Sequence, residues 1–336
     1  MAAEHPLVSV VIPLLNEAEC LPRLHEELRR HCDPLPYRFE FLFVDDGSTD
    51  RSSAVLAELH RGDQRVRYLL LSRNFGHQAA LSAGLAQAAG DAVIMMDGDL
   101  QHPPAVIPQL LEKFEAGYDV VNTVRRETAD VGPVKRLSSS LFYRFFNWVG
   151  SVQIVPGGAD FRLVSRPATD ALNDLPEVHR FLRGLVPWLG FRQTTIDFVA
   201  PSRFAGQSKY NLRRSLRLAL EGLTAFSFYP LRRMMLLGWV ITLLSFVYGV
   251  YVLGAHLFAR NTVPGWTSLL LCVLFLGGCQ LLALGVLGEY LGRVLEQVKG
   301  RPLFIVREAV GLPLPHTGRL PVSPQVVGSE PVQRAG

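Results

Sequence analysis

Two long apolar runs that contain no charged residue constrain this chain more than any other feature. The first covers residues 234–259 and the second residues 261–288, and neither contains Asp, Glu, Lys or Arg. Each run exceeds the roughly 20 residues that a helix needs to cross a bilayer. A buried core helix is a poor alternative, because the two runs stand in tandem beside the short segment 260–265. The pattern predicts a membrane hairpin with transmembrane helices at residues 234–259 and 266–290.

Basic residues flank the outer ends of this hairpin. The flanking residues are Arg232, Arg233, Arg293, Lys299 and Arg301. The connecting loop holds only Arg260. Because cytoplasmic loops of membrane proteins carry an excess of Lys and Arg, both ends of the hairpin are expected in the cytoplasm. Residues 1–6 include Glu4 and His5 and lead directly into a predicted strand, so no signal peptide is expected and the large domain is assigned to the cytoplasm.

The composition agrees with a soluble domain joined to this membrane part. Hydrophobic residues make up 49% of the chain and charged residues 19%, and the apolar excess is concentrated in the two runs. We expect a cytoplasmic domain at residues 1–210, a juxtamembrane helix at 211–233, a cytoplasmic segment at 291–310 and a disordered tail at 311–336. Arginines interleaved with leucines make the juxtamembrane helix amphipathic, and the tail has few large apolar residues. The net charge of +4 is small, and no nucleic-acid partner is expected.

Predicted strands and helices alternate in the first part of the chain. Short runs rich in β-branched, aromatic and other apolar residues predict strands at residues 8–13, 39–44, 66–71, 91–96 and 118–123. Helical spacing predicts helices at residues 19–30, 52–59, 78–89 and 106–114. This alternation predicts an α/β domain with a mostly parallel sheet. The chain has no G-x-G-x-x-G fingerprint and no Walker lysine loop, which argues against a dinucleotide-binding or P-loop fold.

Acidic residues follow two of the predicted strands. Asp45 and Asp46 close the second strand, and Asp97 and Asp99 close the fourth. In open α/β sheets, ligands bind outside the carboxyl ends of the strands. Asp45 and Asp46 are therefore candidates for hydrogen bonds to a base or a ribose. A turn in which Asp caps a helix explains this pair equally well.

The turn after the fourth strand offers ligands for a hard divalent cation. Mg²⁺ prefers oxygen ligands and usually takes one or two carboxylates together with substrate phosphates. Asp97, Asp99 and the amide oxygen of Gln101 supply such a partial shell for Mg²⁺ or Mn²⁺. An acidic turn that merely closes a strand is the simpler alternative. A cation here and a base near Asp45 would together hold a nucleoside diphosphate conjugate.

Four segments of the chain, in this order, resemble the family 2 glycosyltransferases with a GT-A fold. They are VSVVIPLLNEAECLP at residues 8–22, VDDGSTD at 44–50, SRNFGHQAALSAGLAQAAGD at 72–91 and MDGDLQHPP at 96–104. Within that family the chain is most similar to the polyprenyl-phosphate glycosyltransferases, and the resemblance runs from Val8 to about Lys299. It implies transfer of a sugar from a nucleotide sugar onto a polyprenyl phosphate, with inversion at the anomeric carbon, at the cytoplasmic face of the inner or plasma membrane.

The resemblance also implies roles for individual residues. Those assigned to the nucleotide sugar are Pro13, Asn16, Glu17, Asp45, Asp46, Arg73, Asp97, Gly98 and Arg125. Those assigned to the metal are Asp97, Asp99 and Gln101. Arg203 and Lys209, in a segment that matches R-x-x-G-x-S-K, are assigned to phosphate contacts. Asp160, in the GGADFRL segment at residues 157–163, is assigned to the acceptor side.

The role of Asp160 follows from the chemistry of the acceptor. A phosphate monoester is already largely ionised near neutral pH, so its attacking oxygen has little need of a base. We therefore expect Asp160 to orient the acceptor or to hold an arginine. A second basic segment, residues 180–184, contributes Arg180 and Arg183 near the same region of the sequence.

The sequence leaves the sugar open. Glucose from UDP-glucose onto undecaprenyl phosphate is the leading interpretation, and GDP-mannose onto a dolichyl or other polyprenyl phosphate is the alternative. A processive polysaccharide synthase is disfavoured, because the Q-x-x-R-W motif is missing and only two spans are predicted. A membrane scaffold that binds nucleotide sugar without catalysis would require a degraded metal site, and here the acidic turn is intact. The resemblance further implies a homo-oligomer, with a tetramer as one form.

Overall fold

The computed structural model describes residues 5–126, 158–178, 180–199, 265–313 and, with gaps at 242, 245 and 249, residues 234–251. The chain divides into two units. One consists of Met1–Leu137, Ile154–Ser208 and Pro302–Gly336, and the other of Ser138–Gln153 and Lys209–Arg301. The expected amphipathic helix at 211–233, Arg203, Lys209 and the tail beyond residue 313 lie outside the described residues.

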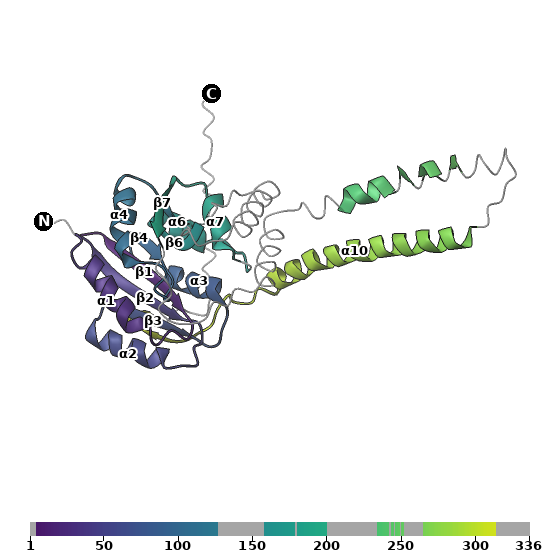
Figure 1. Cartoon of the computed structure of the whole chain (residues 1–336). Coiled ribbons are helices and arrows are strands. Elements are labelled where there is room, and N and C mark those ends of the chain that lie inside the picture. The colour runs from purple at the N-terminus through teal and green to yellow at the C-terminus, as the bar shows by residue number, and fades with distance from the viewer. Residues whose placement is uncertain are drawn as a thin grey trace, which may run out of the picture. The chain divides into compact units, whose positions relative to one another are not determined.

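Within the described residues, eight strands of the first unit form one sheet in the order β7-β5-β6-β4-β1-β2-β3-β8 (Figure 1). The strands are β1 (Leu7–Leu14), β2 (Arg38–Asp45), β3 (Val66–Leu71), β4 (Ala92–Met95), β5 (Val120–Arg126), β6 (Gly158–Ser165), β7 (Gln193–Val199) and β8 (Val306–Val310). β1 pairs in parallel with β2 and β4, β2 with β3, and β5 with β7. β6 runs antiparallel between β4 and β5, and β8 runs antiparallel to β3. The prediction of an α/β domain with a mostly parallel sheet is confirmed.

Helices cover both faces of this sheet. They are α1 (Leu21–Cys32), α2 (Ser52–Gly62), α3 (His77–Gln87), α4 (Ile107–Glu115), which follows the 3-10 turn Pro104–Val106, α6 (Arg166–Asn173) and α7 (Leu182–Trp188). The first four lie within three residues of the predicted helices, and the first five strands within three residues of the predicted strands. Parallel strands that are covered on both faces have largely apolar sequences. For this reason β1 to β4 are readily predicted from the sequence.

The packing of α3 on the sheet positions the start of that helix. α3 contacts β1 and β2. A Cβ atom added at Gly84 would lie 2.3 Å from Val11 Cγ1 and 3.2 Å from Val44 Cγ2. The missing side chain therefore lets the helix lie close to the strands. This close packing fixes where His77 and Gln78, the first two residues of α3, are placed.

Residues 304–310 return to the sheet. Val306–Val310 forms β8 beside β3, Phe304 is buried, and the Ser72 N–H donates to the carbonyl of Ile305 at 2.9 Å. The segment expected as a simple cytoplasmic stretch at 291–310 is thus divided between a helix and an edge strand. β8 covers the hydrogen-bonding edge of β3, which would otherwise be exposed.

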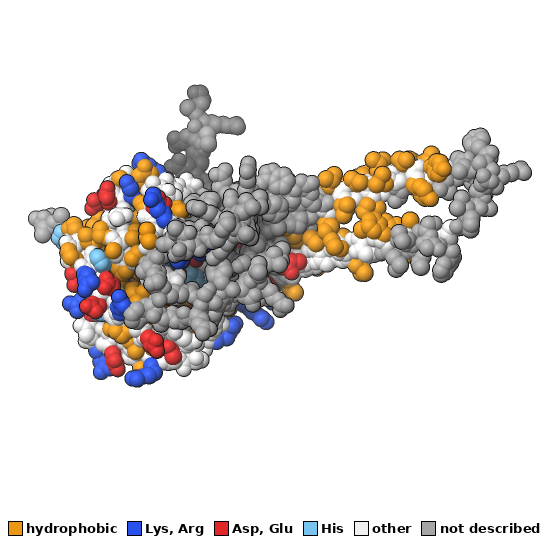
Figure 2. All heavy atoms as spheres, in the orientation of Figure 1, with side chains coloured by type: hydrophobic (Ala, Val, Ile, Leu, Met, Phe, Trp, Pro, Cys, Tyr) orange, Lys and Arg blue, Asp and Glu red, His pale blue; other side chains and the backbone are white. Residues whose placement is uncertain are grey.

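The second unit carries the apolar helices. α10 (Trp266–Lys299) continues past the predicted end of the second span at residue 290, because charges such as Glu289 and Arg293 end the apolar run without ending the helix. Among the described residues, Phe275–Lys299 is the one stretch long and apolar enough to cross a membrane, and Met234–Tyr248 forms a shorter apolar helix. Figure 2 shows exposed apolar side chains along these helices. Two transmembrane helices stay a prediction.

Candidate active site

The loops after β1 and β2 are joined by hydrogen bonds. The Thr49 N–H donates to Asn16 Oδ1 at 2.8 Å, and the Asn16 N–H donates to Ser48 Oγ at 2.8 Å. Asn16 has φ = 58°, in the left-handed region that asparagine adopts more readily than most residues. The Glu17 N–H donates to Ser52 Oγ at 3.1 Å. Two of the residues assigned to the nucleotide sugar therefore also hold these two loops together.

Asp45, the last residue of β2, and Asp46 directly after it are buried and bind backbone groups. Asp45 Oδ1 accepts a hydrogen bond from the Ser48 N–H at 2.8 Å. The Asp46 carboxylate accepts from the N–H groups of Phe75 at 2.7 Å and Gly76 at 2.9 Å, just before α3. Burial raises the pKa of Asp46 above its usual value, and these two hydrogen bonds offset only part of that effect. The contact of Asp45 is a local turn of the kind raised by the sequence, whereas Asp46 binds a loop from a distant part of the sequence.

Arg73 lies in the loop that Asp46 holds. Gly47, with φ = 74°, is so close to this loop that a Cβ atom there would lie 2.6 Å from the carbonyl carbon of Arg73. The Arg73 guanidinium stacks over the Phe75 ring at 4.1 Å from its centroid. The loops that follow β1, β2 and β3 therefore form one connected surface at the carboxyl ends of these strands.

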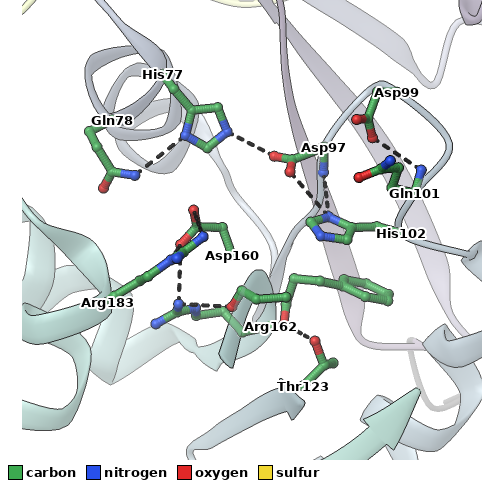
Figure 3. Close-up of polar contacts among 12 residues, drawn as sticks. His77, Gln78, Asp97, Asp99, Gln101, His102, Thr123, Asp160, Arg162 and Arg183 are labelled. Atoms are coloured by element: carbon green, nitrogen blue, oxygen red, sulfur yellow. Dashed lines mark hydrogen bonds and ion pairs between the residues drawn. The ribbon is translucent and has the colours of Figure 1, made fainter. Parts of the chain in front are cut away.

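The acidic turn after β4 is held by its own backbone and by a histidine. The Gln101 N–H donates to Asp99 Oδ1 at 3.0 Å, and Leu100 has φ = 62°. The Asp97 N–H donates to His102 Nδ1 at 2.9 Å (Figure 3). The His102 ring stacks on Phe161 at 5.2 Å between centroids. Burial lowers the pKa of His102 below its usual value, although Asp97 and Asp99 oppose this effect. A neutral ring that accepts at Nδ1 fits this arrangement.

The Asp97 side chain has a second histidine partner. His77 Nε2 lies 2.8 Å from Asp97 Oδ1, and Figure 3 shows the ring directed at the carboxylate. Burial raises the pKa of Asp97, but the contact with His77 and the nearby His102 outweigh it, so the pKa lies below its usual value. On the other side of the ring, His77 Nδ1 lies 3.4 Å from Gln78 Nε2, and Gln78 Oε1 accepts from the Leu182 N–H of α7 at 3.1 Å. α3 thus contacts both the acidic turn and α7.

The side-chain oxygens of the acidic turn suit a hard cation whose remaining ligands come from a substrate and water. Asp97, Asp99 and Gln101 supply only carboxylate and amide oxygens. Among the described residues, no group of three or more His, Cys, Asp or Glu side chains lies close enough to hold a metal. Two carboxylates and an amide are ligands of the kind that Mg²⁺ takes together with phosphate oxygens and water, and a metal at this turn stays a prediction.

Asp160 holds two arginines. It lies on β6, whose neighbour β4 leads into the acidic turn, and alternation along the strand places Arg162 on the same face. Asp160 Oδ1 accepts from Arg183 Nε and Oδ2 from Arg183 Nη2, both at 2.9 Å, while Arg162 Nη2 lies 3.3 Å from Oδ1. Burial raises the pKa of Asp160, but the charge and hydrogen bonds of Arg183 and the charge of Arg162 bring it well below its usual value.

The remaining predicted residues lie as follows. Gly98 packs against the end of β1, where an added Cβ would be 3.5 Å from the Pro13 carbonyl oxygen. Arg125 is exposed near the carboxyl end of β5. Substrate roles for these residues and for the others assigned from the resemblance stay predictions.

Sequence reasoning missed several members of this site. They are His77, Gln78, His102 and Arg183. His77 and Gln78 stand inside the resembling segment 72–91, as two polar residues at the start of an alanine-rich helix, which is a weak signal. Arg183 was noticed only as part of a basic segment, because its pairing with Asp160 depends on the tertiary fold.

Residues 9–168 match the family described as glycosyl transferase family 2. The SfII prophage-derived bactoprenol glucosyl transferase of Shigella flexneri is 40% identical over 302 residues, which cover 90% of this chain and 98% of that protein. An uncharacterized glycosyltransferase of Synechocystis sp. is 41% identical over 305 residues, covering 91% of this chain and 96% of that protein. The solved structure of glucosyl-3-phosphoglycerate synthase from Mycobacterium tuberculosis in complex with Mn²⁺, UDP and phosphoglyceric acid aligns with a TM-score of 0.47 at 21% identity, covering 65% of this chain and 76% of that one. Since relatives about 40% identical match over nearly their whole length, this protein is a glycosyltransferase that belongs to family 2.

Proposed function

We propose that this protein transfers a hexose from a nucleotide sugar onto polyprenyl phosphate at the cytoplasmic face of the membrane. The leading donor is UDP-glucose and the leading acceptor is undecaprenyl phosphate. The observation that carries the proposal is the arrangement beyond the carboxyl end of β4, where the acidic turn at Asp97 and Asp99 lies near the ion pair of buried Asp160 with partly exposed Arg183. The bactoprenol glucosyl transferase named among the relatives supports the choice of sugar and lipid.

The donor half of the site is formed by the loops after β1, β2 and β4. Asn16, Glu17 and Asp45 would contact the base and ribose of the nucleotide. Asp97, Asp99 and Gln101 would hold Mg²⁺ or Mn²⁺, which stabilises the negative charge of the leaving nucleoside diphosphate. His77 and the Gln101 N–H keep the two carboxylates of the turn in place.

The acceptor half contains the basic groups. A lipid phosphate oxygen forms the new bond to the anomeric carbon, while the bond from that carbon to the nucleoside diphosphate breaks and the diphosphate takes the electron pair. The phosphate needs no base because its second ionisation occurs near pH 6. Arg203 and Lys209, which lie outside the described residues, would reduce the repulsion between the two phosphate groups.

The apolar helices would bring this site to the lipid. Residues 234–259 and 266–290 are proposed to cross the membrane, with both outer ends and the catalytic unit in the cytoplasm. The apolar stretch Phe275–Lys299 supports the second span. A cysteine introduced in place of Thr262 should react with a membrane-impermeant maleimide on intact cells. Cys20 and Cys32 are unsuitable as the cytoplasmic control because both are buried, so an added cysteine at the exposed position of Glu58 serves instead.

The product identifies the reaction. The purified full chain in detergent is incubated with undecaprenyl phosphate, Mg²⁺ or Mn²⁺ and, separately, UDP-glucose, UDP-N-acetylglucosamine and GDP-mannose, and the lipids are analysed by mass spectrometry. The expected product is undecaprenyl phosphate with one hexose, formed from UDP-glucose. A single hexose taken from GDP-mannose would support the mannose alternative. Failure of every donor, or growth of a polysaccharide chain, would overturn the proposal.

A further inference from the structure

Gln78 lies between the two halves of the candidate site. Its amide nitrogen lies 3.4 Å from His77 Nδ1 (Figure 3). Its amide oxygen accepts a hydrogen bond from the Leu182 N–H at 3.1 Å, from a residue 104 positions further along the chain. One side chain therefore contacts both the histidine that lies against Asp97 and the helix that carries Arg183.

The contact with α7 determines which way the Gln78 amide points. A backbone N–H can only donate, so the atom that faces Leu182 must be the amide oxygen. Leu182 is the first residue of α7, and the N–H groups of a first turn cannot bond within their own helix. Gln78 supplies the acceptor that this N–H needs. The amide nitrogen is thereby directed at His77.

The same orientation selects one form of the His77 ring. The amide nitrogen of Gln78 can only donate, so His77 Nδ1 must accept, and the proton of the neutral ring is then on Nε2. Nε2 is the nitrogen that lies 2.8 Å from Asp97 Oδ1. The other tautomer would set a donor against a donor at Gln78 and a lone pair against the Asp97 carboxylate. The backbone of α7 thus fixes, through Gln78, the hydrogen bond that orients Asp97.

The second contact of Gln78 leads to the acceptor half of the site. Arg183 directly follows Leu182, and its guanidinium donates to both oxygens of Asp160 at 2.9 Å. Only 11% of the Asp160 side chain is exposed, so its position depends on the groups packed around it. A contact that holds the start of α7 therefore also holds the guanidinium that orients Asp160.

We propose that Gln78 is a positioning residue that couples the acidic turn to the pair of Asp160 and Arg183. Its nitrogen keeps the His77 N–H directed at Asp97, and its oxygen keeps the start of α7 against α3. This inference rests on the proposed function, which assigns the acidic turn to the cation and the Asp160 region to the acceptor. Both halves must meet at one anomeric carbon, and displacements of about 1 Å are costly in such an arrangement.

Two simpler roles compete with this one. The first is a direct contact between Gln78 and the substrate, but both polar atoms of its side chain already have protein partners. The second is a purely structural contact between α3 and α7. A structural contact predicts lower stability without a specific change in cation or acceptor binding. It also predicts that substitutions of Gln78 and His77 act independently.

The first measurement is the binding of Mn²⁺ in the presence of UDP, followed by electron paramagnetic resonance of the free ion, which needs no turnover. Gln78→Met keeps the length of the side chain and removes both amide hydrogen bonds. Its Kd for Mn²⁺ should rise about 2- to 10-fold, the effect of losing one neutral hydrogen bond. In the His77→Ala background the same substitution should raise the Kd no further, because Gln78 acts on Asp97 through His77. An effect of equal size in both backgrounds would overturn the inference.

The second measurement is the KM for undecaprenyl phosphate at saturating UDP-glucose. Gln78→Met should raise this KM about 2- to 10-fold, because the start of α7 loses its contact with α3. His77→Ala should leave it close to the wild-type value, since the contact with Leu182 remains. Gln64→Met is the matched control, because the Gln64 amide donates to the His60 carbonyl at the surface, and it should change neither constant. Gln78→Ala serves if Gln78→Met does not fold.

The outcomes also separate this inference from the proposed function. A wild type that forms no lipid-linked sugar contradicts the proposed function, while the Mn²⁺ Kd of Gln78→Met still tests the coupling to Asp97. An active wild type whose Gln78→Met variant changes neither the Kd nor the lipid KM, or only melts earlier, contradicts the inference alone. A rise in only one of the two constants would show that Gln78 serves one half of the site, which also overturns the coupling.

Discussion

His77 Nε2 lies 2.8 Å from Asp97 Oδ1, so the first residue of α3 contacts the carboxylate that follows β4. The two residues come from different strand-to-helix connections, and the close packing of α3 on β1 brings them together. Loss of a side chain that orients a metal ligand in this way typically lowers metal affinity or activity by about 10- to 100-fold. His77 is therefore part of the candidate cation site although it offers no ligand in the proposed shell.

Replacing His77 should weaken the use of the cation. In His77→Ala the Asp97 carboxylate loses the partner that orients it, so the Mn²⁺ concentration that gives half-maximal activity should rise about 10-fold or more. The measurement is a titration of activity with Mn²⁺ at saturating substrates. His31→Ala removes a surface histidine that contacts Glu27 and should leave the titration unchanged. An unaltered Mn²⁺ requirement in His77→Ala would show that Asp97 does not depend on this contact.

The close approach of α3 to the sheet should make Gly84 sensitive to substitution. Gly84→Ala would place a methyl group 2.3 Å from Val11 Cγ1, so the helix or the strand must shift. We expect a loss of about 1–3 kcal/mol of stability, as is typical for overpacking in a core. Thermal melting of the purified protein in detergent measures it. Gly62→Ala, where no atom lies within 4 Å of the added Cβ, should melt like the wild type. Equal melting of both variants would contradict the packing.

Gly47 should affect the donor side of the site. Gly47→Ala adds a Cβ 2.6 Å from the Arg73 carbonyl carbon and strains a residue with φ = 74°, so the loop held by Asp46 must move. The KM for UDP-glucose should rise several-fold, while the KM for the lipid acceptor changes little. Gly190→Ala has similar strain at φ = 75° but no atom within 4 Å of the added Cβ, which makes it a matched control. A donor KM that rises equally in both variants would indicate a general effect of strain.

Asp63 should contribute stability that is lost in acid. Its carboxylate accepts from Arg65 Nη2 at 2.8 Å and contacts His25 Nε2 at 3.1 Å. Burial raises the pKa of Asp63, but the hydrogen bonds from Arg65 and His25 outweigh it and lower the pKa from 3.8 to about 2. Because the folded pKa lies below the unfolded one, this contribution is complete above about pH 4 and disappears as the pH falls toward 2.

The variant Asp63→Asn isolates that contribution. It should cost about 2 kcal/mol at neutral pH, which corresponds to a pKa shift of nearly two units. Melting temperatures of the wild type and of Asp63→Asn should therefore differ at pH 7 and approach each other as the pH is lowered from 4 toward 2. Two curves that stay parallel over this range would mean that Asp63 is not stabilised by its ionised form.

The sequence predicted the first half of the sheet well and the second half poorly. β1 to β4 are mostly apolar because both faces are covered, and such runs are easy to recognise. β6 is equally central, but Asp160 and Arg162 interrupt its apolar pattern, so it was read only as a motif. β8 is a short edge strand with Arg307 and Glu308 exposed, and nothing in its local sequence indicates that it pairs with β3.

The candidate site, too, was predicted only in part from the sequence. The acidic turn was predictable because its position after a buried strand and its residue types both point to a ligand site. The contacts of Asp97 with His77 and of Asp160 with Arg183 join residues 20 and 23 positions apart through the fold. Such contacts depend on how α3 and α7 pack, which local patterns do not encode. Asp46 holds the loop before α3. From the sequence, only a turn in which Asp caps a helix was considered as its structural role.

The most direct measurement follows the formation of hexosyl undecaprenyl phosphate from UDP-glucose over time, with divalent cation or with chelator. It tests both the proposed reaction and the role of the acidic turn in binding the cation. The wild type is expected to form the product only with Mg²⁺ or Mn²⁺. Asp97→Ala and Asp99→Ala are expected to form none while melting like the wild type, because both residues lie past the end of β4 and outside the core. Asp170→Ala, which removes an exposed partner of Arg166, should remain active. Undiminished product in chelator, or full activity of either turn variant, would contradict a metal-dependent transfer at this turn.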